Sequence, residues 1–299
     1  MPDIPLWNKC DNRCVMCANE PAFARAPSGR YLLKSQIKRF ESYLSGFNTA
    51  YAKNADNGAA LNLTGGEPAL NPDFFKLLAY FRKRTPGREL TLLSNGRHFS
   101  AAAFAAATLK AGKAPLAVAV SLHGSTAARH DSVSGVMGSF NATLAGLRNI
   151  CAHKSSGQTL EIRLVLHRRN IKDFNNMLLL LLREFSGFRG WRAVALHYEL
   201  EGRALKNSKT LSLRLKTSAM AVNSCAGLIR RFKEFRLYHF PLCILKKELR
   251  PLAWVTLPPE DRFYARECGG CALRANCVGL MARYRVRFGS GELRPLKII

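Results

Sequence analysis

Three cysteines near the start of the chain have the type and spacing to hold a metal centre. Cys10, Cys14 and Cys17 lie within a stretch of eight residues. A structural zinc site needs four ligands, which usually come as paired C-x-x-C hooks, so this trio does not fit one. Thiolates also bind iron-sulfur clusters, which normally have four thiolate ligands. A cluster that is bound by three cysteines has one iron free to bind a small molecule. The alternative is that these are three unrelated cysteines of the hydrophobic core.

The C-x3-C-x2-C spacing of this trio resembles that of the radical S-adenosylmethionine (SAM) enzymes. The resemblance implies that the open iron of a 4Fe-4S cluster binds the amino and carboxylate groups of SAM. It also implies that an electron from the cluster splits the sulfonium and gives a 5′-deoxyadenosyl radical. Many relatives have an aromatic residue before the third cysteine, against the adenine, where this chain has Met16. Because methionine is soft enough to pack on a ring, we expect Met16 to contact SAM.

A second motif follows the strand expected at Leu61 to Thr64. Gly65, Gly66 and Glu67, followed by a proline, match the GGEP motif of the same family, which receives the amino group of SAM. Two glycines let the backbone approach a ligand closely, and the glutamate offers an acceptor for an ammonium group. Without the cysteine trio, the motif would be an ordinary turn between a strand and a helix.

Three further polar residues stand at the ends of expected strands. Ser94 and Asn95 occupy the position of the family's T/S-N-G element, and Ser121 ends the next strand. The resemblance implies that they lie near the methionyl and ribose groups of SAM, for which short hydroxyls and amides are suitable partners. A polar strand end before a glycine turn is the alternative.

Arg163 lies inside an apolar strand expected at Leu160 to Leu166. An arginine on the inner face of a barrel is costly unless it is paired with an anion. The resemblance implies that this anion is the carboxylate of SAM, and the alternative is an arginine that faces the surface.

His123 and His130 are candidate catalytic residues, because they belong to a loop expected at 123–138. Histidine can carry a proton near neutral pH, but loop histidines are commonly surface hydrogen-bonding groups. Cys151 and Cys225 are expected to be buried apolar residues without a function.

Four more cysteines stand in the last part of the chain, at Cys243, Cys268, Cys271 and Cys277. Their spacing leaves structural zinc and a closed iron-sulfur cluster open as alternatives. The C-x2-C-x5-C run followed by Gly279 resembles the twitch or SPASM appendage of radical SAM enzymes. This resemblance implies an auxiliary 4Fe-4S cluster, with Cys243 as its upstream ligand.

Apolar strands that alternate with helices must bring these residues together. Strands are expected at 4–9, 61–64, 89–94, 116–122, 159–166 and 191–198, with helices at 34–47, 72–84, 100–112, 138–153 and 171–184, and loops between, one of them at 50–60. This pattern predicts βαβ units and a parallel sheet. We expect an α/β fold, a partial (β/α)6 TIM-type barrel over residues 1–205, with chemistry at the carboxyl ends of the strands. Residues 206–299 are expected to form a small C-terminal Fe-S (twitch or SPASM-like) domain that includes a basic helix at 217–235.

Composition limits the remaining choices. No run of about 18 apolar residues predicts a membrane span, and nine unevenly placed cysteines favour a reducing cytoplasm over a disulfide framework. The net charge of +26 is extreme and should attract anionic partners such as RNA or an acidic peptide. No RNA-binding motif is apparent in the sequence.

Several short segments beyond these motifs resemble the C-type radical SAM maturase of His-Xaa-Ser peptide systems. They are His130-Asp131, Gly138-Ser139-Phe140, Gly146-Leu147, residues 161–167 and Pro241-Leu242-Cys243. This resemblance implies hydrogen abstraction from a peptide or small protein, with electrons from a reductase such as flavodoxin or ferredoxin. Only nine residues precede Cys10, so we expect docking of the substrate to need a partner protein or the basic surface of this protein. The rival hypotheses are a radical SAM enzyme that modifies RNA and a non-enzymatic basic zinc-binding module.

Overall fold

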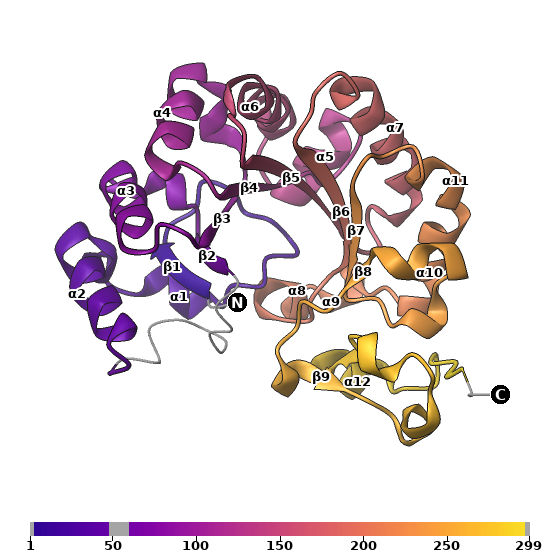
Figure 1. The fold of residues 1–299 in the computed structure, drawn as a ribbon. Coiled ribbons are helices and arrows are strands. Elements are labelled where there is room, and N and C mark those ends of the chain that lie inside the picture. The colour runs from indigo at the N-terminus through magenta and orange to yellow at the C-terminus, as the bar shows by residue number, and fades with distance from the viewer. Residues whose placement is uncertain (1–2, 48–59, 297–299) are drawn as a thin grey trace.

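The computed structural model describes residues 3–47 and 60–296. Within these residues, one sheet contains eight strands in chain order, all of them parallel. The strands are β1 (Asp3–Trp7), β2 (Ala60–Gly65), β3 (Glu89–Ser94), β4 (Leu116–Ser121), β5 (Gln158–Leu166), β6 (Trp191–His197), β7 (Phe235–Tyr238) and β8 (Ala253–Trp254). Among the described residues β1 does not pair with β8, so the barrel is open, and Figure 1 shows the resulting arc. The expected α/β partial barrel is confirmed.

The outer face of this arc is covered by α2 (Leu33–Leu44), α3 (Phe74–Arg84), α4 (Ala102–Gly112), α6 (Ser139–His153), α7 (Phe174–Phe185), α10 (Leu215–Ser224) and α11 (Ala226–Ile229) (Figure 1). The other helices in this part of the chain are α1 (Pro21–Arg25), α5 (Ala127–Ser134), α8 (Gly202–Lys206) and α9 (Ser208–Leu211). None of the described helices is long and apolar enough to cross a membrane.

Alternation along each strand separates a core face from an inner face. In β5, Leu160, Ile162 and Leu164 are buried in the hydrophobic core that the helices cover. Successive side chains in a strand point to opposite faces, so Glu161 and Arg163 point to the inside of the barrel. The apolar positions therefore build the fold, and the polar positions between them line its interior.

The sheet extends beyond the six strands expected from the sequence. β7 and β8 lie in the region assigned to the C-terminal domain, and they continue the barrel sheet. The prediction of one helix at 217–235 is wrong. α10 ends at Ser224, α11 ends at Ile229, and β7 begins at Phe235. Alternation of Phe235, Arg236, Leu237 and Tyr238 is typical of a strand with one buried face.

The remaining segments are the two expected loops and the part of the chain after β8. The loop expected at 123–138 contains α5, whose first turn is capped by the side chain of Thr126. The loop expected at 50–60 lies almost wholly outside the described residues. After β8, a two-stranded antiparallel ladder of β9 (Arg262–Phe263) and β10 (Leu280–Met281) packs with α12 (Ala282–Phe288). In Figure 1 this segment lies below the β8 end of the arc.

Candidate functional site

The segment with the first three cysteines crosses from β1 to the far side of the barrel. The amides of Arg13 and Val15 donate to Ser134 O and Val133 O in α5, at 2.8 and 2.9 Å. At its other end, Cys17 O accepts from the amide of Arg203 in α8 at 2.9 Å. These bonds fix the loop to elements that follow β4 and β6. It therefore lies at the carboxyl ends of the strands, where barrel enzymes have their active sites.

The three thiols of this loop are neighbours. Cys10 is exposed, and Cys14 and Cys17 are half-buried. Burial, and then the charges of Cys17 and Cys10, raise the pKa of Cys14 to about 12. Cysteines bind metals as thiolates, whereas burial here favours the neutral thiols. The positive charge of an iron centre would stabilise the thiolates. The donor set fits a cluster that is bound by three cysteines.

Gly65 and Gly66 allow a close approach between two backbone segments. A Cβ on Gly65 would lie 2.2 Å from Trp7 O, and one on Gly66 would lie 2.2 Å from Lys9 O. The amides of Gly66 and Glu67 donate to Trp7 O and Lys9 O at 2.7 and 2.8 Å. Both glycines therefore let the turn after β2 pack on the backbone that leads to Cys10, and this contact needs no ligand.

Glu67 joins the predicted SAM residues to one another. Its fully buried carboxylate accepts from Ser94 Oγ at 2.8 Å, Asn95 N at 2.7 Å and Ala69 N at 3.1 Å. Burial nevertheless raises the pKa of Glu67 to about 7. A cation beside this group would favour its ionised form, so the site suits an ammonium group. The structure brings Glu67, Ser94 and Asn95 together, as the motifs predicted.

Asp11, between the first two cysteines, was not identified from the sequence. It accepts from Asn95 Nδ2 at 2.7 Å and from Arg97 Nη1 at 2.8 Å, and His98 Nε2 lies 3.6 Å away. The side chain of Asn95 is therefore already bonded to the cysteine loop. Only the polar character of Arg97 and His98 directly after Asn95-Gly96 could have indicated this contact.

Ser121 and Arg163 are register partners on β4 and β5. Arg163 donates from Nε to Glu161 Oε1 at 2.6 Å, and within the described residues its two terminal nitrogens have no hydrogen-bond partner. Its side chain is 20% exposed, so it remains accessible from the barrel interior. Arg163 thus has an internal counterion, which the sequence did not reveal, and donors that remain for a second anion.

Met16 and the two candidate histidines lie in packed surroundings. Met16 is partly buried against the hydrophobic core. His123 and His130 are buried with ring centroids 5.1 Å apart, and His130 packs edge-on against Phe140 of α6. Burial lowers the pKa of both rings, that of His130 to about 4. Both histidines are therefore neutral and buried, and their catalytic role stays a prediction.

The four C-terminal cysteines line one small cavity with apolar neighbours. Cys243 is in a short 3-10 turn (Leu242–Ile244) and Cys268 in another (Arg266–Gly270). Backbone amides point at the sulfurs: Leu242 N and Gly279 N lie 3.4 Å from Cys277 Sγ, and Arg294 N lies 3.3 Å from Cys243 Sγ. Such amide donors are suited to thiolates that are bound to iron or zinc.

In the described ranges 3–47 and 60–296, no three His, Cys, Asp or Glu side chains are placed to hold a single metal ion. Tetrahedral zinc needs four sulfurs about 2.3 Å from one point. Thiolates are also the ligands of iron-sulfur clusters, and three thiols in one group and four in the other are compatible with such clusters.

Comparison with known proteins identifies one family over the barrel. Residues 4–181 match the model of the Radical SAM superfamily. The mycofactocin maturase MftC of Mycobacterium tuberculosis is 31% identical over 115 residues, which cover 38% of this chain and 27% of that protein.

Solved structures support the same fold. SuiB of Streptococcus suis bound to S-adenosylmethionine matches with a TM-score of 0.55 and 13% identity, over 79% of this chain and 49% of that one. The anSMEcpe enzyme with bound AdoMet and the Kp18Cys peptide matches with a TM-score of 0.51 and 16% identity, over 75% and 58% of the two chains. This chain thus spans about half the length of these structures and a smaller share of MftC.

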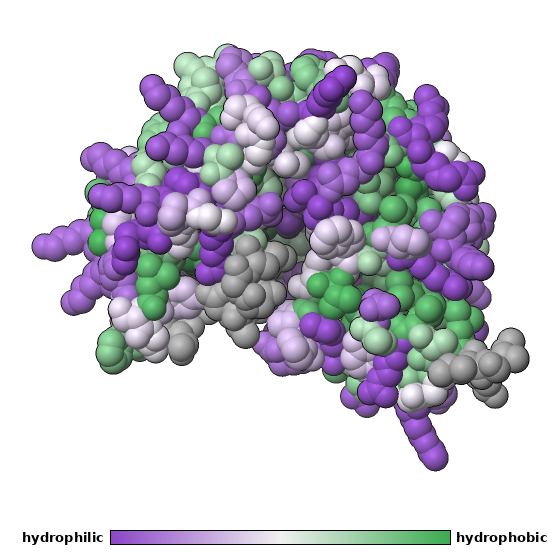
Figure 2. All heavy atoms as spheres, in the orientation of Figure 1, coloured by the Kyte–Doolittle hydropathy of each residue, from purple (hydrophilic) through white to green (hydrophobic). Residues whose placement is uncertain are grey.

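Polar residues border the hollow in the middle of the face in Figure 2.

Proposed function

Because this chain belongs to the radical SAM superfamily, we propose that it cleaves SAM reductively and uses the radical to abstract hydrogen from a peptide or small protein. The family implies SAM and a 4Fe-4S cluster as cofactors. A cluster in this position supplies the electron that splits the sulfonium of SAM. The observation that carries the proposal is the cysteine loop, which α5 and α8 fix across the carboxyl ends of the strands.

Each residue of the site has a role in this proposal. Cys10, Cys14 and Cys17 hold the cluster, and Glu67 favours the amino group of SAM through its buried carboxylate. Arg163 binds the carboxylate of SAM through its terminal nitrogens, while Glu161 keeps its guanidinium in place. The further contacts proposed for SAM are made by Met16, Gly65, Gly66, Ser94, Asn95 and Ser121.

A peptide is the substrate class that the comparisons support. SuiB was solved with its precursor peptide SuiA, and this chain matches that structure with a TM-score of 0.53. The anSMEcpe match also contains a peptide. The net charge of +26 would attract an acidic peptide at long range. A reductase such as flavodoxin or ferredoxin and a partner that docks a leader peptide complete the proposal.

We propose that the C-terminal cysteines hold an auxiliary 4Fe-4S cluster. Four thiols around one cavity provide the full ligand set of such a cluster. An electron acceptor beside the barrel suits a reaction in which the substrate radical must be oxidised or coupled.

Anaerobic reconstitution tests the proposal in two steps. Iron and sulfide should reach about eight atoms each per chain, as two 4Fe-4S clusters require. With a strong reductant the protein should release 5′-deoxyadenosine from SAM, and mass spectrometry of co-expressed candidate peptides should show a mass change. Stoichiometric zinc without iron would instead support the zinc-binding module. RNA binding near physiological salt, with an RNA product, would support the RNA-modifying alternative.

A further inference from the structure

An alternating row of charged side chains runs across the inner face of β5, β6 and β7 and includes Glu234, directly before β7. Arg163 donates to Glu161 Oε1 at 2.6 Å, and Arg192 donates to Glu161 Oε2 at 2.7 Å. Arg192 also lies 3.7 Å from Glu234, whose Oε1 accepts from Arg236 Nε at 2.9 Å. The order is therefore Arg163, Glu161, Arg192, Glu234 and Arg236, with an arginine at each end.

This row carries one positive charge more than its carboxylates can balance. Three arginines give +3 and two glutamates give −2, so the sum is +1. Although burial opposes ionisation, Arg163 and Arg192 lower the pKa of Glu161, so that carboxylate stays charged. Among residues 3–47 and 60–296, each terminal arginine has one carboxylate partner, which it shares with Arg192. Both ends of the row are therefore suited to a further anion.

The two ends lie in the same layer of the sheet. Arg163 pairs with Val194, and Val194 pairs with Arg236. Neighbouring strands are about 4.8 Å apart, so the backbones of Arg163 and Arg236 are about 10 Å apart. An anion at Arg236 would thus lie beside the one proposed at Arg163 without competing for it.

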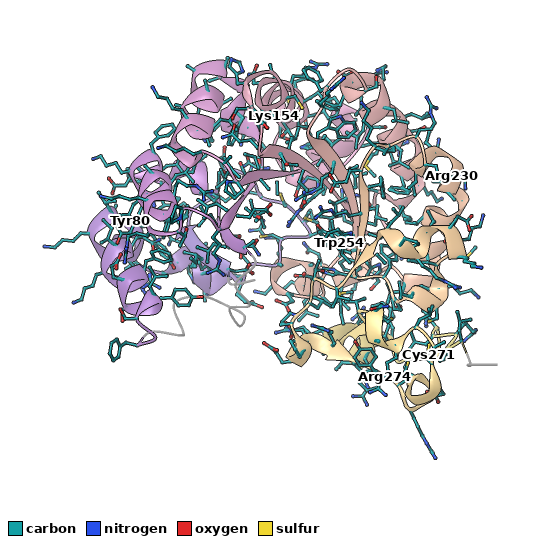
Figure 3. All side chains as sticks on the ribbon, viewed as in Figure 1. Tyr80, Lys154, Arg230, Trp254, Cys271 and Arg274 are labelled. Carbon is teal, nitrogen blue, oxygen red and sulfur yellow. The ribbon has the colours of Figure 1, made fainter. Side chains whose placement is uncertain are left out.

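An exposed aromatic residue marks the Arg236 end. The guanidinium of Arg236 stacks on the ring of Trp254, with 3.8 Å from its carbon to the ring centroid. Trp254 is 48% exposed, and its neighbour Val255 is 42% exposed. Figure 3 places Trp254 at the edge of the sheet that leads to the C-terminal segment. A large exposed aromatic next to a partly neutralised arginine is typical of a binding subsite.

We propose that Arg236 and Trp254 form the subsite that binds a carboxylate of the peptide substrate together with an adjacent apolar side chain. Arg236 binds the carboxylate, and Trp254 with Val255 contacts the apolar residue. The inference rests on the proposed function for a peptide as the substrate. It assigns Arg163 to the cofactor and Arg236 to the substrate, at opposite ends of one row of charges.

Fluorescence anisotropy with short labelled peptides tests this subsite. The probes are an amidated peptide with one Glu between leucines, the same peptide with Gln, and the Gln peptide with a free C-terminus. The holoprotein is used anaerobically at about 0.15 M salt, where long-range attraction is screened. We expect the Glu peptide to bind about tenfold more tightly than its amidated Gln counterpart. Preference for the free C-terminus would support the subsite too and identify the terminal carboxylate as its ligand.

Four variants distinguish binding at this subsite from non-specific attraction to the positive charge of the protein. Arg236→Gln should remove the preference for a carboxylate, and Arg236→Lys should restore part of it. Arg230→Gln removes the same charge from an exposed position outside the row, labelled in Figure 3, and should keep the preference. Trp254→Ala changes an exposed side chain and should weaken binding of both amidated peptides. This variant tests the subsite if Arg236→Gln does not fold. Circular dichroism checks the fold of each variant.

Two results would overturn the inference. One is equal affinity of the parental protein for all three peptides, and the other is a folded Arg236→Gln variant that keeps the full preference. Binding is measured without reductant, so it does not depend on radical chemistry. A protein that discriminates the peptides but never cleaves SAM would contradict the proposed function alone. A protein that cleaves SAM but does not discriminate would contradict this inference alone.

Discussion

The two groups of cysteines are held in different ways. The loop with Cys10, Cys14 and Cys17 is fixed by backbone bonds from α5 and α8, which lie far along the chain. The C-terminal group is supported by short turns and by amides of nearby residues such as Leu242 and Gly279. The first site therefore needs α5 and α8 from later parts of the barrel, whereas the second combines the turn between β7 and β8 with the segment after the barrel. Changes in each region should affect its own cluster first.

The largest effect is expected for Cys14→Ala. Loss of a ligand from a set of three should lower SAM cleavage by at least about a hundredfold, because even outer-shell changes cost 10- to 100-fold. Iron should fall from about eight to about four per chain. Chromatography of 5′-deoxyadenosine and iron analysis measure both quantities. Release of 5′-deoxyadenosine at the parental rate would contradict the assignment of the active site.

Cys271→Ala probes the other group. We expect loss of the C-terminal cluster and of peptide product, while SAM cleavage continues, because the barrel loop does not depend on this cysteine. Iron should again fall to about four per chain. If this variant retained the parental iron content, the proposed auxiliary cluster would have other ligands.

Acid should affect the barrel before the C-terminal segment, because all seven histidines precede residue 240. Burial lowers the pKa of His130 and His167 to about 4 and that of His197 to about 3, from an ordinary 6.5. The unfolded chain therefore binds more protons as pH falls from about 6.5 toward 4, and the free energy of unfolding falls with it. Glu67 offsets part of this loss, because its raised pKa lets the folded state bind a proton before the unfolded state does. We expect about 3 kcal/mol less stability at pH 5 than at pH 7 in urea titrations followed by tryptophan fluorescence. Equal values at the two pH values would mean that these rings are not buried as described.

The smallest effect is expected for alanine substitutions at two glycines, Gly66 near the N-terminal cysteines and Gly270 among the C-terminal cysteines. An alanine at Gly66 would place its Cβ against Lys9 O, which is backbone and cannot move aside cheaply, whereas Gly270 has no atom within 4 Å. Gly66→Ala should cost about 2 kcal/mol of stability and lower the iron bound at the trio. Gly270→Ala is the matched control and should change neither. Similar melting temperatures for the two variants would contradict the packing of the GGEP turn on the cysteine loop.

Periodicity and spacing predicted what depends on the local sequence. Six strands could be predicted because apolar runs alternate with helices, and the proximity of Cys268, Cys271 and Cys277 because they are close in the sequence. β8 was missed because two residues, Ala253–Trp254, carry no pattern. The helix expected at 217–235 failed because the basic residues near Arg230 obscured the turn after Ile229.

Pairing across strands could not be predicted in the same way. Contacts such as Asp11 with Arg97, or Arg192 with Glu161, depend on register between segments that are distant in the sequence. A polar residue at alternate positions of an apolar strand, as at Glu161 and Arg163, indicates an inner face but not its partner. The role of Gly66 likewise follows from a backbone contact with Lys9 that sequence alone does not reveal.

The bond from Arg203 N to Cys17 O sets an order for biogenesis. A nascent chain that has emerged only as far as β5 has all three N-terminal thiols but lacks the segment that fixes their loop. Machinery that delivers preassembled iron and sulfide would therefore meet a rigid acceptor only after translation has passed α8. Maturation of the holoprotein is in this sense a late event, although the three thiols are translated well before α8.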